Sequence, residues 1–274
     1  SEALEYGVDL ILGPGVNIHR HPLCGRNFEY YSEDPFLTGE IGAAMVNGIE
    51  SNGVGATPKH FVANNQETSR NINNSIVSDR AMREIYLKGF EIIVKKSQPW
   101  AIMSSYNKVN GVYTSESKPL LTDILRNEWG YEGIVMTDWF GGNNVSEQIK
   151  AGNDLLEPGT KNIWDNLIKA YEDGDLSLKE IDLSVSRILG LIIKSKKMDN
   201  YDFTNKPDLN ENAIITRRSA SEGMVLLKNE NALPFENIKN IALMGSTSFN
   251  FIAGGTGSGD VEEAYTVSLE EALL

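Results

Sequence analysis

Short apolar runs, each followed by a segment of helical pattern, are the feature that most constrains the fold of this 274-residue chain. Five runs occur, at Val8–Ile18, Gly53–Ala63, Pro99–Val109, Gly133–Trp139 and Ala151–Gly159. They are continuous rather than alternating, which is typical of parallel strands that are covered on both faces. Alternating strands and helices predict an α/β fold.

The segments after and between these runs have apolar residues at helical spacing. The predicted helices are Phe36–Ser51, Ser78–Lys96, Lys118–Gly130, Ile163–Gly174, Ser177–Lys197 and, later in the chain, Ile215–Glu230. About five strand–helix units are visible, whereas a (β/α)8 TIM barrel has eight. The pattern therefore leaves two architectures open: an open parallel sheet, or a TIM-like barrel whose first units lie before Ser1.

The composition of the chain changes after residue 198, where a polar stretch with Pro207 indicates a linker. A new apolar strand is predicted at Asn240–Ser246. We therefore divide the chain into a partial barrel domain (1–198), a linker with a connecting helix (199–238) and the start of a second domain (239–274).

Composition excludes several classes of function. A net charge of −13 argues against a nucleic-acid partner, because phosphate binding needs a basic surface. No segment approaches the roughly 20 apolar residues of a membrane span. Cys24 is the only cysteine, so the chain has neither an internal disulfide nor a cysteine-based zinc cluster. The net negative charge of the chain suits a neutral substrate.

Polar side chains gather where the apolar runs end. They are His19, His21 and Arg26 after the first run, Lys59 and His60 in the second, Ser104–Asn107 in the third, Asp138 and Trp139 in the fourth, and Glu157 in the fifth. In a barrel, and in an open parallel sheet, the carboxyl ends of the strands face one crevice. These groups are therefore expected to surround one pocket.

This mixture of cations, an imidazole, a phenol, a carboxylate and an indole suits a ligand rich in neutral hydroxyl groups. Charged side chains make strong hydrogen bonds to hydroxyls, and the face of Trp139 could pack on a sugar ring. A carboxylate among cations keeps a low pKa, so Asp138 is expected to be ionised and able to act as a nucleophile. The alternative is that Asp138 only caps the loop after its strand.

Metal and nucleotide sites are less well supported. His19 and His21 form a His-x-His pair, but only His60 could join them, and Pro22 indicates a loop. We therefore predict no metal ion and no cofactor. The glycine-rich loop Gly254–Asp260 lacks the Gly-Lys-Ser/Thr of a phosphate-binding loop.

Several long motifs, in order, resemble the β-glucosidase branch of the family 3 glycoside hydrolases. They are GPGVNIHRHPLCGRNFEYYSEDP (Gly13–Pro35), KHFVANNQETSR (Lys59–Arg70), SYNKVNGVY (Ser105–Tyr113), GIVMTDWFG (Gly133–Gly141), GMVLLKNENALP (Gly223–Pro234) and GGTGSGDV (Gly254–Val261). The resemblance implies a TIM-like barrel, incomplete at its N-terminus here, followed by the start of an α/β sandwich.

The resemblance also implies a role for each residue at the rim. Asp138 matches the catalytic nucleophile, and the positions that hold or line the sugar match Arg26, Lys59, His60, Arg70, Met103, Tyr106 and Trp139. The implied reaction is retaining hydrolysis of terminal non-reducing β-D-glucosyl residues through a glycosyl-aspartate intermediate. The implied ligands are β-glucosides and cello-oligosaccharides.

Two family groups are not found in this chain. A sugar-binding aspartate is expected before Ser1, and the acid/base glutamate is expected beyond Leu274; Glu262 and Glu263 lie in a different motif. The alternatives that remain are a β-xylosidase or another exo-acting glycosidase of the family, and a truncated sugar-binding relative without turnover. Oligomerisation of the full-length protein and its compartment stay open, with the cytoplasm slightly favoured over secretion.

Overall fold

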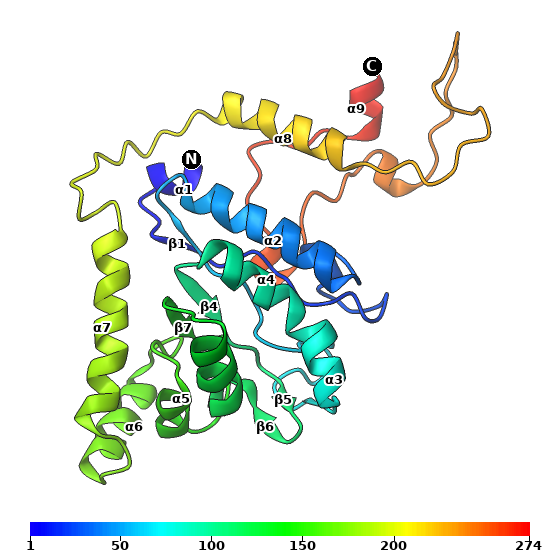
Figure 1. Cartoon of the computed structure of the whole chain (residues 1–274). Helices are drawn as coiled ribbons and strands as arrows, with labels where there is room; N and C mark the ends of the chain where they lie inside the picture. Colours follow the sequence, from blue (N-terminus) through cyan, green and yellow to red (C-terminus); the bar gives the residue numbers. More distant parts are fainter. The chain divides into compact units, whose positions relative to one another are not determined.

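A computed structural model describes residues 1–274 and divides them into two compact units, Ser1–Asp208 and Leu209–Leu274. The first unit holds all of the strands (Figure 1). These are β1 (Leu10–Ile11), β2 (Gly55–Ala56), β3 (Asn74–Ser75), β4 (Ala101–Met103), β5 (Lys108–Val109), β6 (Val112–Tyr113) and β7 (Ile134–Met136).

Helices alternate with these strands. The α-helices of the first unit are α1 (Glu2–Glu5), α2 (Pro35–Glu50), α3 (Asp79–Ala81), α4 (Lys88–Ser97), α5 (Val145–Ala151), α6 (Lys161–Glu172) and α7 (Leu178–Lys194). Two π-helical segments, η2 (Met82–Tyr86) and η4 (Pro119–Glu128), and two short 3₁₀ turns, η1 (Asn27–Glu29) and η3 (Thr114–Glu116), complete the unit.

The predicted apolar runs lie side by side as parallel neighbours in the order of the sequence. The pairs that join them are Leu10 with Gly55, Gly15 with Lys59, Phe61 with Ser104, Ile102 with Val135, and Met136 with Leu155. This confirms the predicted parallel α/β arrangement. The first and fifth segments do not pair with each other, so closure into a barrel stays a prediction.

The central strands are buried on both faces, as continuous apolar runs predict. Ile102 of β4 and Val135 of β7 belong to the large core cluster that also contains α2 and α4 residues. Their neighbours in sequence point to the opposite face, because side chains alternate along a strand. That second cluster includes Met103 and Met136 and packs against Ile188 of α7.

Helices α2 and α4 lie side by side (Figure 1) because glycine lets them approach closely. A Cβ atom added at Gly39 would lie 2.8 Å from Cβ of Ile92 on α4. Asp34 caps α2 by accepting a hydrogen bond from the backbone N–H of Phe36 at 2.7 Å. The predicted helix Phe36–Ser51 is confirmed to within one residue at each end. Helix α5 was not predicted.

The second unit contains α8 (Leu209–Gly223), α9 (Leu269–Leu273) and two 3₁₀ turns, η5 (Ser246–Ser248) and η6 (Gly257–Gly259), but no strand. The prediction of a strand at Asn240–Ser246 was wrong for this chain. An extended segment becomes a strand only when a second one pairs with it, and this unit provides none. Whether residues 239–274 begin a sandwich domain stays a prediction.

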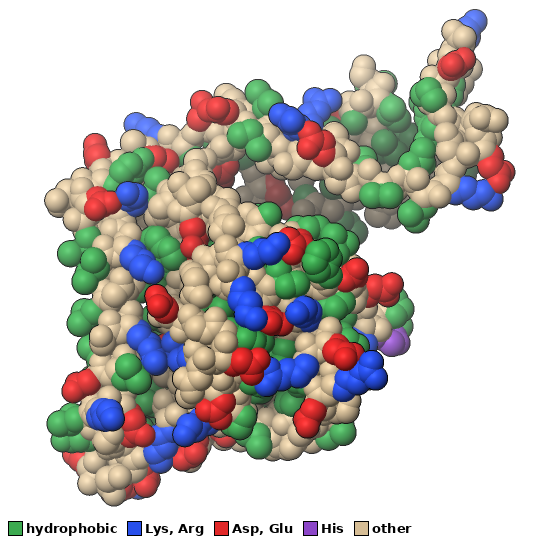
Figure 2. Space-filling model, viewed as in Figure 1, with side chains coloured by type: hydrophobic (Ala, Val, Ile, Leu, Met, Phe, Trp, Pro, Cys, Tyr) green, Lys and Arg blue, Asp and Glu red, His purple; other side chains and the backbone are tan.

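Basic and acidic side chains are interspersed over the visible face of the first unit (Figure 2). Ion pairs of this unit include Lys96 with Glu40 at 2.6 Å and Arg83 with Glu128 at 2.6 Å. None of the helices is both long enough and apolar enough to cross a lipid bilayer.

Candidate active site

Asp138 lies two residues after the end of β7, and backbone hydrogen bonds of Asp138 and of its neighbour Thr137 fix its position. Its N–H donates to the carbonyl oxygen of Ser104 at 3.2 Å, and its own carbonyl oxygen accepts from the N–H of Gly141 at 2.9 Å. The preceding residue, Thr137, donates its N–H to Leu155 at 3.0 Å. Neighbouring strands on both sides therefore place the carboxylate at the carboxyl end of the sheet.

The two carboxylate oxygens of Asp138 have different surroundings. Oδ1 accepts a hydrogen bond from the backbone N–H of Trp139 at 2.8 Å. Oδ2 is buried and has no hydrogen-bond partner in the chain; Nε2 of His60 lies 3.7 Å from it, beyond hydrogen-bond length. One oxygen is thus held by the backbone, and the other is available to a ligand.

Burial raises the pKa of Asp138, and the N–H of Trp139, the hydroxyl of Tyr106 and the charges of Arg26 and Lys59 only partly offset this effect. The low pKa predicted from the sequence was therefore wrong in direction. The sequence showed the cations but not the desolvation of a side chain that is only 7% exposed. A raised pKa makes the ionised carboxylate more basic.

His60 is a neutral hydrogen-bonding group. Its side chain is fully buried, and this desolvation, together with Arg26, Lys59 and Arg70, holds its pKa well below the ordinary value. Its Nδ1 lies 3.2 Å from the Tyr30 hydroxyl. The imidazole can therefore exchange a hydrogen bond with a hydroxyl group, and its contact with Asp138 is not an ion pair.

Asn17 fixes the backbone of His60. Its Oδ1 accepts from the backbone N–H of His60 at 2.8 Å, and its Nδ2 donates to the carbonyl oxygen of His60 at 2.9 Å. Asn17 is 3% exposed. The two bonds leave the imidazole little freedom to turn away from Asp138.

Arg26 and Lys59 are brought together by one carboxylate. Glu29, in η1, accepts a hydrogen bond from Nε of Arg26, and its Oε2 lies 3.6 Å from Nζ of Lys59. Desolvation lowers the pKa of Lys59, and the charge of Glu29 opposes that effect. Two cationic donors are thus held close to Asp138, and the single negative charge of Glu29 balances one of their two positive charges.

Arg70 and Tyr106 form a second pair. The guanidinium of Arg70 lies 4.6 Å from the centre of the Tyr106 ring, and its Nη1 donates to Oε2 of Glu67 at 2.7 Å. Burial, reinforced by the negative charge of Asp138, raises the pKa of Tyr106 to about 12. Tyr106 therefore keeps its proton and can donate to the carboxylate.

Trp139 and Met103 have different surroundings. Trp139 is 39% exposed at the rim, where its indole could cover a ligand. Met103 is 2% exposed and packs in the core with Met136. Its predicted place in the wall of the sugar pocket stays a prediction.

The sequence analysis missed Asn17, Glu29 and Tyr30. A signal existed for Asn17, because an amide within an apolar run must find hydrogen bonds. Glu29 lies three residues after Arg26, which is the spacing of neighbours on a helical turn. Nothing in the sequence marked Tyr30 as a neighbour of His60.

The three histidines have separate partners. Nε2 of His19 lies 2.9 Å from the carbonyl oxygen of Asn27, and Nδ1 of His21 accepts from the N–H of Leu23. The structure contains no group of three or more side chains that could hold a metal ion.

The family of the chain follows from comparison with known proteins. Residues 1–191 match the model of the glycosyl hydrolase family 3 N terminal domain. The chain belongs to glycoside hydrolase family 3. The family's N-terminal domain has a TIM-barrel type fold, which fits the run of parallel strands and helices seen here.

Solved and curated members of family 3 extend the comparison. The structure of β-glucosidase 3B from Thermotoga neapolitana in complex with glucose is 50% identical, with a TM-score of 0.96 over 99% of this chain and 39% of that chain. A β-glucosidase from Rhizobium radiobacter is 43% identical over 99% of this chain and 34% of its own length. An exo-α-(1→6)-L-arabinopyranosidase from Bifidobacterium breve is 43% identical over 85% of this chain and 30% of its own length. The chain thus spans about a third of the length of these curated relatives.

Proposed function

We propose that this chain provides the nucleophile and most of the glucose-binding side chains of a retaining β-glucosidase. The observation that supports the proposal most strongly is the buried Oδ2 of Asp138, which has no partner in the chain and faces a neutral imidazole, a phenol and two cations. β-Glucosidases among the relatives, one of them solved with glucose, support the choice of sugar.

In this proposal the sugar is held by its hydroxyl groups. Arg26 and Lys59 donate charge-assisted hydrogen bonds, and neutral His60 donates or accepts one. Arg70 extends the donor set beside Tyr106, and Trp139 covers the apolar face of the ring. Because Glu29 and Asn17 fix these donors before a ligand arrives, little ordering is needed when the sugar binds.

The chemistry begins when Oδ2 of Asp138 attacks the anomeric carbon. A bond forms between Oδ2 and that carbon, and the bond to the leaving-group oxygen breaks with its electron pair. Tyr106 and the N–H of Trp139 stabilise the carboxylate before the attack. Water then displaces Asp138 from the same face that the leaving group occupied, which returns the original anomeric configuration.

The leaving oxygen needs a proton from a second carboxyl group, about 5–5.5 Å from the first in retaining enzymes. Glu29 and Glu67 do not suit this task, because each is engaged by cations. We propose that the donor is a glutamate beyond Leu274, in a sandwich domain that residues 239–274 begin, and that residues 1–198 form part of a closed barrel.

Two alternatives remain. The first is an exo-acting glycosidase with a different sugar preference, and the similarity to an arabinopyranosidase supports it. A sugar-binding relative without turnover would keep the binding groups and lack the proton donor. Both would preserve the side chains around Asp138 described above.

Product stereochemistry tests the proposal. The chain is incubated with 2,4-dinitrophenyl β-D-glucoside, whose leaving group needs little protonation, and the first sugar released is followed by proton NMR. We expect β-glucose to appear first and α-glucose only later, by mutarotation. Release of α-glucose first would overturn the retaining mechanism. Faster turnover of the matched xyloside or α-L-arabinopyranoside would reassign the sugar.

A further inference from the structure

The imidazole of His60 is neutral, so one of its ring nitrogens carries a proton and the other carries a lone pair. Nε2 lies 3.7 Å from Oδ2 of Asp138. Nδ1 lies 3.2 Å from the hydroxyl oxygen of Tyr30 and 3.3 Å from Oδ1 of Asn17. The position of the proton therefore decides whether His60 presents a donor or an acceptor beside Asp138.

The two buried neighbours of Nδ1 favour opposite tautomers. The amide oxygen of Asn17 can only accept, so it favours a proton on Nδ1. Tyr30 can donate, because burial raises the pKa of its hydroxyl and the hydroxyl keeps its proton. Its contact with Nδ1 is the one hydrogen bond that this hydroxyl makes within the chain, whereas Oδ1 of Asn17 also accepts from the backbone N–H of His60 at 2.8 Å.

This asymmetry favours the tautomer in which Tyr30 donates to Nδ1. A proton on Nδ1 would leave the buried hydroxyl proton of Tyr30 without an acceptor, which costs free energy. Asp138 acts in the same direction. Its Oδ2 has no hydrogen-bond partner in the chain, and its negative charge attracts an N–H on Nε2 but repels a lone pair there.

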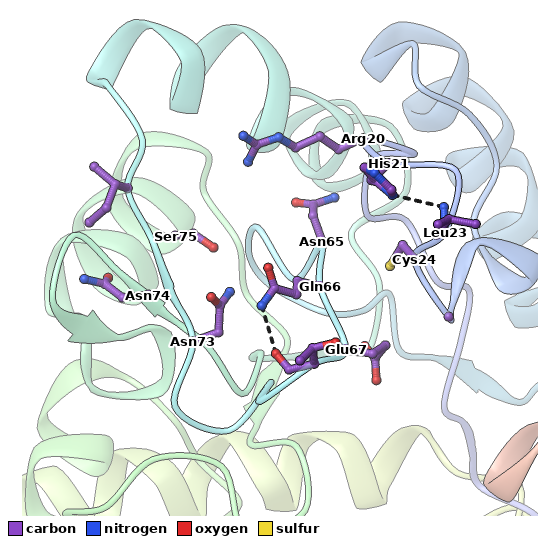
Figure 3. Close-up of a pocket in the computed structure, with 13 residues that line it drawn as sticks. Arg20, His21, Leu23, Cys24, Asn65, Gln66, Glu67, Asn73, Asn74 and Ser75 are labelled. Carbon is purple, nitrogen blue, oxygen red and sulfur yellow. Dashed lines mark hydrogen bonds between the residues drawn. The ribbon is translucent and has the colours of Figure 1, made fainter.

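Tyr30 and His60 are both buried, so little water competes for their hydrogen bond. Figure 3 shows a surface cavity of about 830 Å³ whose lining includes Cys24, Asn65 and Glu67. Neither Tyr30 nor His60 belongs to that lining. A donor that is shielded from solvent in this way is not readily replaced by a water molecule.

We propose that Tyr30 is a positioning residue that places the proton of His60 on Nε2. His60 then donates a hydrogen bond to a sugar hydroxyl that lies against Oδ2 of Asp138, and this consequence rests on the proposed function. Without the hydroxyl of Tyr30, the proton moves to Nδ1, where Oδ1 of Asn17 accepts it. Nε2 then presents a lone pair and no longer donates to the sugar.

NMR of the chain labelled with ¹⁵N-histidine tests the tautomer directly, because protonated and unprotonated ring nitrogens have well-separated chemical shifts. His60 is identified by comparison with His60→Gln. At neutral pH we expect a protonated Nε2 in the unaltered chain and a protonated Nδ1 in Tyr30→Phe. A protonated Nδ1 in the unaltered chain would overturn the inference, whether or not the variant folds.

Tyr131→Phe is the matched control. It removes another buried tyrosine hydroxyl, which donates to the carbonyl oxygen of Ile134 at 2.7 Å. The spectrum of His60 should be the same in this variant as in the unaltered chain. If Tyr30 only stabilises the fold, neither variant changes the tautomer of His60, and that result would contradict the proposal.

Hydrolysis of 2,4-dinitrophenyl β-D-glucoside tests the consequence for the sugar. We expect Tyr30→Phe to lower kcat/KM about ten-fold, which is the effect of losing one neutral hydrogen bond, and Tyr131→Phe to leave kcat/KM unchanged. A tautomer that switches while kcat/KM stays the same would refute the role of His60 as a donor. If the unaltered chain does not hydrolyse the glucoside, the proposed function fails, and the NMR spectra still decide whether Tyr30 sets the tautomer.

Discussion

Two buried aspartates lie beside β7, Asp138 two residues after its end and Asp154 opposite Val135, and their surroundings are opposite. Asp154 has every strong donor it needs: Oδ2 accepts from Arg126 at 2.6 Å and from the N–H of Val135 at 2.8 Å, and Oδ1 accepts from Arg187 at 2.9 Å. Asp138 has one oxygen held by the backbone and one without a partner.

The difference separates a carboxylate that holds the fold from one that is available for chemistry. Asp154 ties η4 and α7 to the strands through Arg126 and Arg187, so its charge is fully used inside the protein. Asp138 is surrounded by donors that stop short of its Oδ2. A buried group left unsatisfied in this way indicates a ligand.

The largest expected effect comes from Asp138→Asn. The amide cannot attack the anomeric carbon, so we expect hydrolysis of the dinitrophenyl glucoside to fall by about 10⁴-fold. Stability should not fall, because the substitution removes a desolvated charge whose pKa is raised. Initial rates and a urea melt check both parts, and a variant that keeps its activity would sink the assignment.

Asp154→Asn should have the converse effect. It leaves Arg126 buried with its ion pair lost, which costs about 3–5 kcal/mol of unfolding free energy. Urea denaturation of this variant is compared with Asp165→Asn, which removes only the exposed pair with Lys161 and should cost under about 1 kcal/mol. Equal costs for the two variants would contradict the account of Asp154.

A smaller effect concerns the pH dependence of stability. The pKa of His60 is depressed in the folded protein, so the unfolded chain binds the extra proton first. Stability should therefore fall as the pH drops below about 6.5, with a slope of at most about 1.4 kcal/mol per pH unit from this group. Urea melts between pH 7.5 and 5.5 should show a shallower slope for His60→Gln, and an unchanged slope would refute the buried neutral histidine.

The smallest effect is expected in the pH profile of Lys59→Met, which tests the cations around Asp138. Losing this charge should raise the pKa of Asp138 further, because Lys59 is one of the groups that lower it. The acidic limb of the rate of glycosylation should then move to higher pH by a fraction of a unit. A limb that stays in place, or moves to lower pH, would show that Lys59 does not act on the carboxylate.

Much of the fold followed from local patterns. The apolar runs predicted the parallel strands, and apolar spacing predicted helices such as α2 and α7 to within a few residues. The absence of a strand at Asn240–Ser246 could not be predicted, because strand formation depends on a partner that the sequence pattern does not reveal. Helix α5 is too short for a periodic pattern, although Asn144 caps it through Ser146.

The proximity of some of the predicted side chains could be foreseen from the sequence, but their electrostatics could not. Parallel strands bring their carboxyl ends to one face, so the positions of Asp138, His60 and Lys59 near strand ends predicted that they lie close together. Glu29 and Asn17 act through backbone and ion-pair geometry that appears only in the folded chain. The direction of the pKa shift at Asp138 likewise depends on burial, which a list of neighbouring charges does not include.

The most direct test of the central claim is peptide mass mapping after treatment with 2,4-dinitrophenyl 2-deoxy-2-fluoro-β-D-glucoside. The activated leaving group needs little protonation, and the fluorine slows breakdown of the intermediate, so a covalent adduct should accumulate. We predict a 2-fluoroglucosyl mass gain on the peptide that contains Asp138 and none on the peptide that contains Asp154. An adduct on any other carboxylate, or no adduct on a folded chain, would contradict the assignment of Asp138 as the nucleophile.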